Sequence, residues 1–244
     1  MKPKHLGKHT NHKFETYSPS LLDAVKRNSP KQLTTFFGHD YWNAYEFSYL
    51  NSRNQPVLES LEIKIPMTSI ATVESKSLKL YLASLFNKKF NDPNKAYNLI
   101  EKDISQLINS NVTVKKTTNY QAPPKSVLLN SSTNKITKNK IIKFEGFRSI
   151  CPVTSQPDWA NIYFHSTSNS IDPKPLIKLL QSYRSRGDFH EACIESIFLS
   201  MLNDLHIDDL TVYGRFLRRG GIDINPLRST KGKFIFLNFR DKVQ

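Results

Sequence analysis

The sequence predicts an α+β protein with two tandem modules, each with antiparallel strands and with helices on one face. Three observations predict this fold class. The chain contains an internal repeat, its predicted strands show alternating apolar residues, and amphipathic helices separate the strands. The 244 residues are enough to bury a sizeable core, and the 38% hydrophobic content is typical of a globular protein.

The internal repeat has an offset of 98 residues. Glu74–Leu82 (ESKSLKLYL) aligns with Asp172–Leu180 (DPKPLIKLL), and the same offset aligns Val112 with Leu210. Because the similarity extends over a predicted helix and a predicted strand, duplication of one module explains it better than a single chance match.

The first half contains two predicted strands, Tyr45–Leu50 and Leu58–Met67, and apolar residues alternate along the second. A helix follows, with apolar residues on one face within Leu78–Phe86. Asp92-Pro93 supplies the N-cap and the first-turn proline of a second helix. Asn111–Thr118 is predicted to be a returning strand.

The second half repeats this order of strands and helices. The predicted strands are Phe144–Ile150, Trp159–His165, Leu210–Phe216 and Phe234–Phe239, and apolar positions within Leu176–Tyr183 and Ala192–Leu205 mark two helices.

The predicted organisation has four parts. Residues 1–40 form an N-terminal arm with one short helix at Pro19–Arg27, and residues 41–130 form the first module. Residues 131–143 are a linker rich in Lys, Asn and Ser, and residues 144–244 form the second module.

The net charge of +14 invites a nucleic-acid-binding interpretation. Seven lysines and no acidic residue lie between Asn111 and Phe144. The few aromatic residues there do not interleave with the lysines as a base-stacking surface requires. A solvated linker and strand surface is the favoured interpretation, with no direct nucleic-acid binding.

The cysteine content and the hydropathy exclude several classes of protein. With only Cys151 and Cys193, a disulfide framework is not expected, and a reducing cytoplasm is the expected compartment. The polar start, Met1–Lys13, lacks the apolar stretch of a secretory signal, and no apolar run is long enough to cross a membrane.

Cys151 and Asp158 lie seven positions apart, each beside a proline, in the phrase Cys-Pro-Val-Thr-Ser-Gln-Pro-Asp. Free cysteines are often small buried hydrophobes, as expected for Cys193 on its apolar helix stripe. Pro152 favours an extended or turn conformation at Cys151, and nearby Arg148 could favour a nucleophilic thiolate. Asp158 is either a turn residue or an acid for the group that the thiol attacks.

His190 and Glu191 follow Gly187-Asp188 where a helix is expected to begin. Asp188 could be the N-cap and Glu191 its capping-box partner. Alternatively, the Glu191 carboxylate could accept two parallel hydrogen bonds from a guanine-like ring.

Two further phrases are candidate phosphate sites. Glu74-Ser75-Lys76-Ser77 is typical of a helix start, and the free N–H groups, hydroxyls and lysine there could also bind an anion. Arg218–Gly221 (RRGG) is predicted to be a tight turn or a phosphate contact. No glycine-rich dinucleotide fingerprint is present. The histidines at positions 5, 9, 12 and 39 lack metal-site spacing, so no zinc is expected.

These phrases together resemble the NADPH-dependent 7-cyano-7-deazaguanine reductases, the nitrile reductase family of the tunnelling-fold superfamily. The resemblance rests on the phrase at Glu74–Leu82, the Cys151–Asp158 phrase, Gly187–Glu191 (GDFHE) and Arg218–Pro226 (RRGGIDINP). The Glu-Ser-Lys phrase precedes the Cys phrase, as in the two-module branch of the family. The segment His39–Glu46 also resembles that branch.

The resemblance implies two tandem tunnelling-fold modules with a ββααββ order of elements. It also implies reduction of the nitrile of 7-cyano-7-deazaguanine (preQ0) to 7-aminomethyl-7-deazaguanine (preQ1) in tRNA queuosine biosynthesis. Cys151 would form a thioimide with the nitrile carbon, and Asp158 would protonate the nitrogen. Two NADPH molecules would be used as cosubstrates, with no metal.

The resemblance also implies which residues bind the two ligands. Val73, Glu74, Ser75, His190 and Glu191 would hold the substrate, with His190 also assisting proton movement, and Ser75, Lys76, Arg219 and Gly220 would hold NADPH. Because the first half has no Cys-Pro phrase, one catalytic centre per chain is expected, which the Glu-Ser-Lys phrase reaches from the other module or another chain. A cytoplasmic homodimer is expected, because tunnelling folds close their barrel with several modules.

Two alternatives remain at this point. One is a purine- or pterin-binding enzyme of the cyclohydrolase type, which would share the fold, although the chain lacks a convincing set of zinc ligands. The other is a basic nucleic-acid-binding module, which only the net charge supports.

Overall fold

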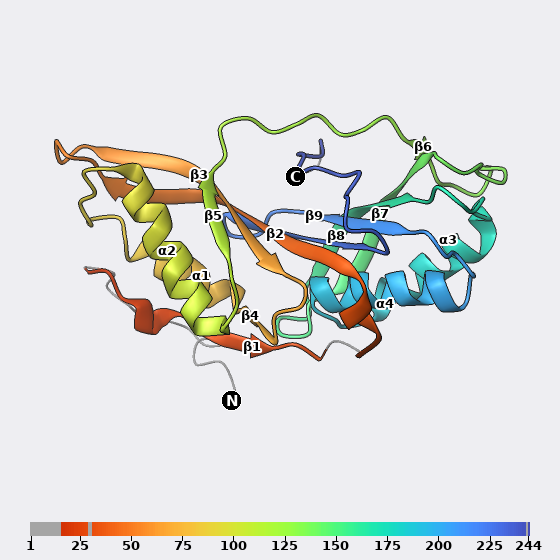
Figure 1. Cartoon of the computed structure of the whole chain (residues 1–244), viewed down its shortest axis with the longest axis horizontal. Helices are drawn as coiled ribbons and strands as arrows, with labels where there is room; N and C mark the ends of the chain where they lie inside the picture. The colour runs from red at the N-terminus through yellow and green to blue at the C-terminus, as the bar shows by residue number, and fades with distance from the viewer. Residues whose placement is uncertain (1–15, 29–30, 243) are drawn as a thin grey trace. The chain divides into compact units, whose positions relative to one another are not determined.

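The computed structural model describes residues 16–28, 31–242 and 244, and the chain divides into two compact units (Figure 1). The first unit contains Met1–Arg27, Tyr41–Asn119 and Arg218–Asp223; the second contains Asn28–Asp40, Tyr120–Leu217 and Ile224–Gln244. The expected boundaries differ from these. Residues 28–40 and the whole expected linker group with the second unit, and residues 218–223 group with the first.

In the first unit, strands are ordered β5-β3-β2, and α1 and α2 lie next to one another alongside them (Figure 1). The elements are β1 (Ala24–Lys26), β2 (Phe37–Leu50, from Tyr41 on), β3 (Pro56–Pro66), β4 (Ala71–Val73), α1 (Ser75–Ala83), α2 (Pro93–Ile108) and β5 (Thr113–Lys116). Leu61, Ile63 and Ile65 of β3 are fully buried, as the predicted alternation requires.

The N-caps of the helices support the internal repeat. Asp92 accepts a hydrogen bond from the backbone N–H of Asn94, and Pro93 begins α2, as predicted. Glu74 caps α1, and Asp172, 98 positions later in the sequence, caps α3. Both acidic side chains accept from the backbone N–H two residues on.

In the second unit the strand order is β10-β9-β8-β7-β6. The elements are η2 (Lys31–Thr35), β6 (Val127–Leu128), β7 (Ile141–Ile150), β8 (Pro157–His165), α3 (Pro173–Ser182), η3 (Tyr183–Ser185), α4 (His190–Asn203), β9 (Thr211–Phe216) and β10 (Ile222–Ser229, from Ile224 on). The pairings β7–β8, β8–β9 and β9–β10 are antiparallel, whereas the short β6 pairs in parallel with β7.

The last strand was predicted in the wrong place. Phe234–Phe239 is not a strand. Phe236 and Phe239, three positions apart, are buried against the rings of Tyr163 and Tyr213, so ring packing accounts for the apolar residues of this segment. The strand is β10, whose buried polar residues interrupt the apolar pattern by which strands are recognised.

Two other predictions need correction. Pro19–Arg27 is not one helix: η1 (Pro19–Leu21) is a single 3₁₀ turn, and β1 follows it. In the first half, β5 follows the helices within the first unit, but the next strand, β6, belongs to the second unit. None of the described helices is both long and apolar enough to cross a membrane.

A buried ion-pair cluster stabilises the second unit. The Arg228 guanidinium on β10 is fully buried and lies 2.8 Å from an Asp40 oxygen and 2.7 Å from a Glu195 oxygen on α4. Burial disfavours the charged guanidinium, but Asp40 and Glu195 outweigh this effect and raise the pKa of Arg228. The cluster therefore ties α4 to two strand segments.

We predict that Arg228→Met lowers the free energy of unfolding by about 3–5 kcal/mol, because two carboxylates are left buried without their shared cation. Urea unfolding measures this difference. Arg53→Met, at an exposed position in the β2–β3 turn, is the matched control and should change stability little. Equal stability of the two variants would contradict the role of the cluster.

Candidate active site

The β7–β8 hairpin carries both Cys151 and Asp158. Ser149 pairs with Asp158, and Ile150 pairs with Pro157, so residues 151–156 form the connecting loop. The Cys151 backbone N–H donates to the Gln156 carbonyl at 2.8 Å, and its carbonyl accepts from the Ser155 N–H at 3.0 Å. The seven-residue spacing seen in the sequence is therefore the spacing of a closed hairpin.

The two faces of the hairpin have different roles. Ser149 and Asp158 are buried on one face, whereas Arg148 stacks over the Trp159 ring on the other. Cys151 follows directly after the end of β7, in the loop that leads back to Asp158 on β8. The Arg148 guanidinium donates to the Arg184 carbonyl. These contacts give no evidence for the expected stabilisation of the Cys151 thiolate by the Arg148 guanidinium.

His190 lies against Asp158. Its Nε2 is 3.3 Å from the Asp158 Oδ2, and its ring stacks on Phe216 with centroids 3.9 Å apart and an interplanar angle of 11°. The buried His190 Nδ1 has no hydrogen-bond partner within the described part of the chain. The imidazole is thus held by one nitrogen and one ring face.

The Gly187–Glu191 phrase packs beside the hairpin. Gly187 forms a bridge with Ile150, and α4 then begins at His190. Asp188 is not the N-cap: Phe189 occupies that position, and Asp188 pairs with Arg186 at 2.7 Å. The predicted N-cap role of Asp188 is therefore wrong, and Glu191 is buried in the first turn of α4.

Phe216 is a site residue that sequence reasoning missed. Its N–H donates to Asn225 Oδ1 at 3.2 Å, and its carbonyl accepts from Gln244 Nε2 at 2.8 Å. Gln244 Nε2 also donates to Asn225 Oδ1. Asn225 and Gln244 thus hold the backbone of Phe216, whose ring stacks on the imidazole. All three residues are distant in sequence from His190, so only the fold reveals this arrangement.

The two cysteines differ as the sequence predicted. Cys193 is fully buried on α4, and this burial raises the pKa of its thiol to about 12. Cys151 is partly exposed and is not in a disulfide. Only Cys151 is therefore accessible as a nucleophile in the folded chain.

In the first unit, Glu74 is itself the N-cap of α1. Its carboxylate accepts from the backbone N–H of Lys76 at 2.9 Å and from that of Ser77 at 2.7 Å. The predicted helix start is confirmed. The predicted anion site loses these two N–H donors, so a phosphate there would depend on side chains.

We call Lys76 and Lys79 of α1 and Arg218 and Arg219 of the turn 218–221 the basic cluster, because Lys79 lies against this turn. A Cβ added to Gly220 would lie 3.2 Å from the Lys79 Nζ, and Gly220 and Gly221 both have positive φ, which glycine favours. Lys76 and Lys79 are one helical turn apart on α1. Sequence reasoning missed Lys79, although its spacing from Lys76 was visible. The cluster suits the phosphates of NADPH.

Val73 occupies a different environment from the other candidates. It lies on β4, paired with Ala24 of β1, and the whole residue is only 1% exposed. Within the described residues, no cluster of three or more His, Cys, Asp or Glu side chains could hold a metal ion.

Comparison with known proteins identifies the family. The model described as "Nitrile reductase, 7-cyano-7-deazaguanine-reductase N-term" matches residues 14–116, and "QueF-like protein" matches residues 157–233. NADPH-dependent 7-cyano-7-deazaguanine reductases from Coxiella burnetii and Desulfotalea psychrophila are each 37% identical to this chain. Both alignments cover 96% of this chain, and 94% and 95% of the respective relatives.

The chain belongs to the 7-cyano-7-deazaguanine reductase family. The reductase of Hahella chejuensis is a further member, 34% identical over 93% of both chains. Because the two family models match successive parts of the chain, the predicted tandem α+β organisation is confirmed. The resemblance found in the short phrases thus extends over nearly the whole chain.

We predict that Ellman's reagent titrates one thiol in the folded protein and two after unfolding, because Cys193 is buried and Cys151 is not. The absorbance of the released thiolate gives the count. Cys151→Ala should leave no fast thiol, whereas Cys193→Ala should leave one. Two fast thiols in the native chain would contradict the assignment.

Proposed function

We propose that the chain reduces the nitrile of 7-cyano-7-deazaguanine to an aminomethyl group, using two NADPH molecules, in tRNA queuosine biosynthesis. The observation that carries the proposal is the grouping of the Cys151 hairpin, Asp158 and His190 in a member of this family. A nucleophile, a buried carboxyl group and an imidazole are the groups that covalent nitrile chemistry needs.

The first step uses Cys151 and Asp158. The Cys151 S–H bond and one π bond of the carbon–nitrogen triple bond break as the sulfur bonds to the nitrile carbon. The nitrogen takes a proton from Asp158, and the proton released by the thiol replaces it on the carboxyl group. The product is a thioimide, which contains all the atoms of the thiol and the substrate. The stacking on Phe216 and the contact with Asp158 fix His190 so that it can return a proton to this carboxyl group.

Reduction then takes place on the covalent adduct. NADPH supplies one hydride to the thioimide carbon and a second molecule supplies one to the imine carbon. Between these events the carbon–sulfur bond breaks, the Cys151 thiolate leaves, and the imine forms. Two hydrides and two protons convert the nitrile to the amine, so the electrons balance. The contact between Asp158 and His190 supports the proposal that these two groups deliver the protons.

The binding assignments form part of the proposal. In the second unit, the buried Glu191 carboxylate would accept hydrogen bonds from the deazaguanine ring, and His190 would contact the substrate. In the first unit, Val73, Glu74 and Ser75 are assigned to the substrate by family resemblance. Glu74 has spare lone pairs for this, since each oxygen accepts one capping bond.

The cofactor assignment rests on the basic cluster of the first unit. Ser75, Lys76, Arg219 and Gly220 would hold NADPH, and the contact between Lys79 and the Gly220 turn adds Lys79 to this set. We also propose a cytoplasmic homodimer, supported by the two free cysteines and by the use of several modules in tunnelling folds.

We predict that incubation with 7-cyano-7-deazaguanine, without NADPH, increases the mass of the protein by that of one substrate molecule. Addition of a thiol across a nitrile expels no atom, so the increase should equal the full substrate mass. Intact-protein mass spectrometry measures it. Cys193→Ala should keep the adduct and Cys151→Ala should lose it. Normal turnover by Cys151→Ala would exclude the thioimide.

We predict that Asp158→Asn binds the substrate but loses about 100-fold or more in kcat, as expected for removal of a general acid. NADPH oxidation gives the rate, and calorimetric titration of the Cys151→Ala background gives the binding. Asp172→Asn, an exposed N-cap position where asparagine also caps, is the control. Unimpaired turnover would remove Asp158 from the acid role.

A further inference from the structure

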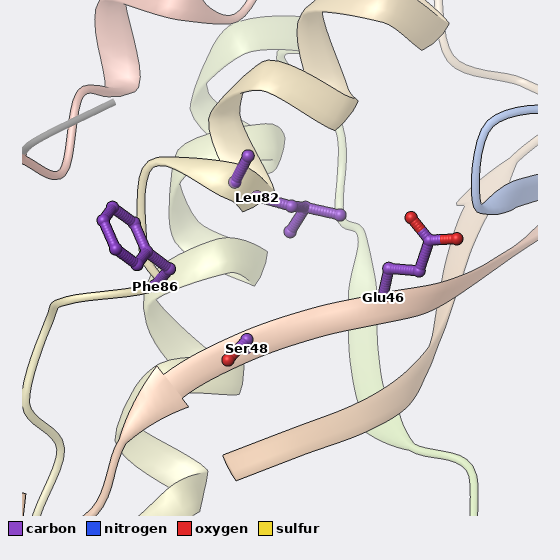
Figure 2. Close-up of a pocket in the computed structure, with 5 residues that line it drawn as sticks. Glu46, Ser48, Leu82 and Phe86 are labelled. Atoms are coloured by element: carbon purple, nitrogen blue, oxygen red, sulfur yellow. The ribbon is translucent and has the colours of Figure 1, made fainter. Parts of the chain in front are cut away.

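A pocket in the first unit belongs to none of the groups assigned above. It encloses about 410 Å³ and is lined by Glu46 and Ser48 of β2, Leu82 and Ala83 of α1, and Phe86 just after α1. Figure 2 shows Glu46 rising from β2 on one side of the pocket and Phe86 on the other, with Leu82 between them and Ser48 on the strand. The walls are apolar on the helix side and polar on the strand side.

The pocket continues from the basic cluster. A Cβ added to Gly221 would lie 2.6 Å from the Glu46 carboxyl carbon, so the turn 218–221 touches the wall of the pocket. Gly220, the preceding residue, touches Lys79. Lys79, Leu82 and Ala83 follow each other along one helix, three and four residues apart. A ligand with phosphates at Lys79 could therefore extend an apolar ring into the pocket.

We propose that this pocket binds the adenine ring of NADPH. Phe86 offers an exposed aromatic face for stacking, and Leu82 and Ala83 offer apolar contact. The Glu46 carboxylate accepts a hydrogen bond from the exocyclic amino group, and the Ser48 hydroxyl contacts a ring nitrogen. The inference rests on the function proposed above and names the part of the cofactor that this surface recognises.

The chemistry of hydride transfer favours the adenine over the nicotinamide ring. The nicotinamide ring has to reach the carbon that is bonded to Cys151. The lining of this pocket includes none of Cys151, Asp158 and His190. The adenosine half carries the phosphates that the neighbouring lysines and arginines would bind.

The test uses adenosine 2′,5′-bisphosphate, which contains the adenosine half of NADPH without the nicotinamide. Calorimetric titration should show that Phe86→Ala raises its Kd about tenfold, the loss expected for one stacked base. Ala83→Trp, at an exposed helix position that faces the pocket, should also weaken binding by filling it. Phe37→Ala, another exposed phenylalanine, is the matched control and should leave the Kd unchanged.

Two further measurements separate the outcomes. Phe86→Ala should still form the Cys151 adduct, and its affinity for reduced nicotinamide mononucleotide should be unchanged. If both pocket variants bind the bisphosphate as the wild type does, or if only the mononucleotide loses affinity, the adenine assignment is wrong while the proposed function stands. If the wild type forms no adduct and oxidises no NADPH, the proposed function itself fails.

Discussion

The register of the β7–β8 hairpin is the constraint on which the proposed chemistry depends. Pairing of Ser149 with Asp158 places the carboxyl group on the buried face, where His190 meets it. A slip of one residue would turn Asp158 to the outer face and Trp159 inward. Burial of Ser149 and Asp158 on one side, and the contact of Arg148 with Trp159 on the other, oppose such a slip.

Buried polar groups inside the second unit also fix the position of α4, the helix that carries His190, and of Phe216. Arg228 joins Asp40 to Glu195, one helical turn after Glu191, and Gln244 and Asn225 hold the backbone of Phe216. Such buried groups are costly unless they are paired, and each of these groups has a hydrogen-bond or ion-pair partner. The His190 ring is therefore held against rotation, which suits a group that transfers protons to and from the Asp158 carboxyl group.

Local signals in the sequence were sufficient for much of this molecule. The N-cap Asp92, the buried face of β3 and the two strands on either side of the Cys151 loop all follow from short-range patterns. β10 was missed because Asp223, Asn225 and Arg228 are buried, and their partners lie far along the chain. Phe216 and Lys79 were missed for the same reason, since stacking on His190 and contact with Gly220 exist only in the folded chain. Of the lysines behind the nucleic-acid alternative, Lys115 and Lys116 lie in ion pairs with acidic residues of β3, which lowers the charge that they present.

The proposed chemistry requires that one sulfur becomes bonded to the carbon of a nitrile while a carboxyl group protonates the nitrogen. A crystal structure of the protein soaked with 7-cyano-7-deazaguanine, without reductant, tests this directly. We expect continuous density from the Cys151 Sγ to the former nitrile carbon, with the nitrogen within hydrogen-bonding distance of Asp158. An unmodified Cys151 Sγ, with the deazaguanine ring bound away from both side chains, would contradict it.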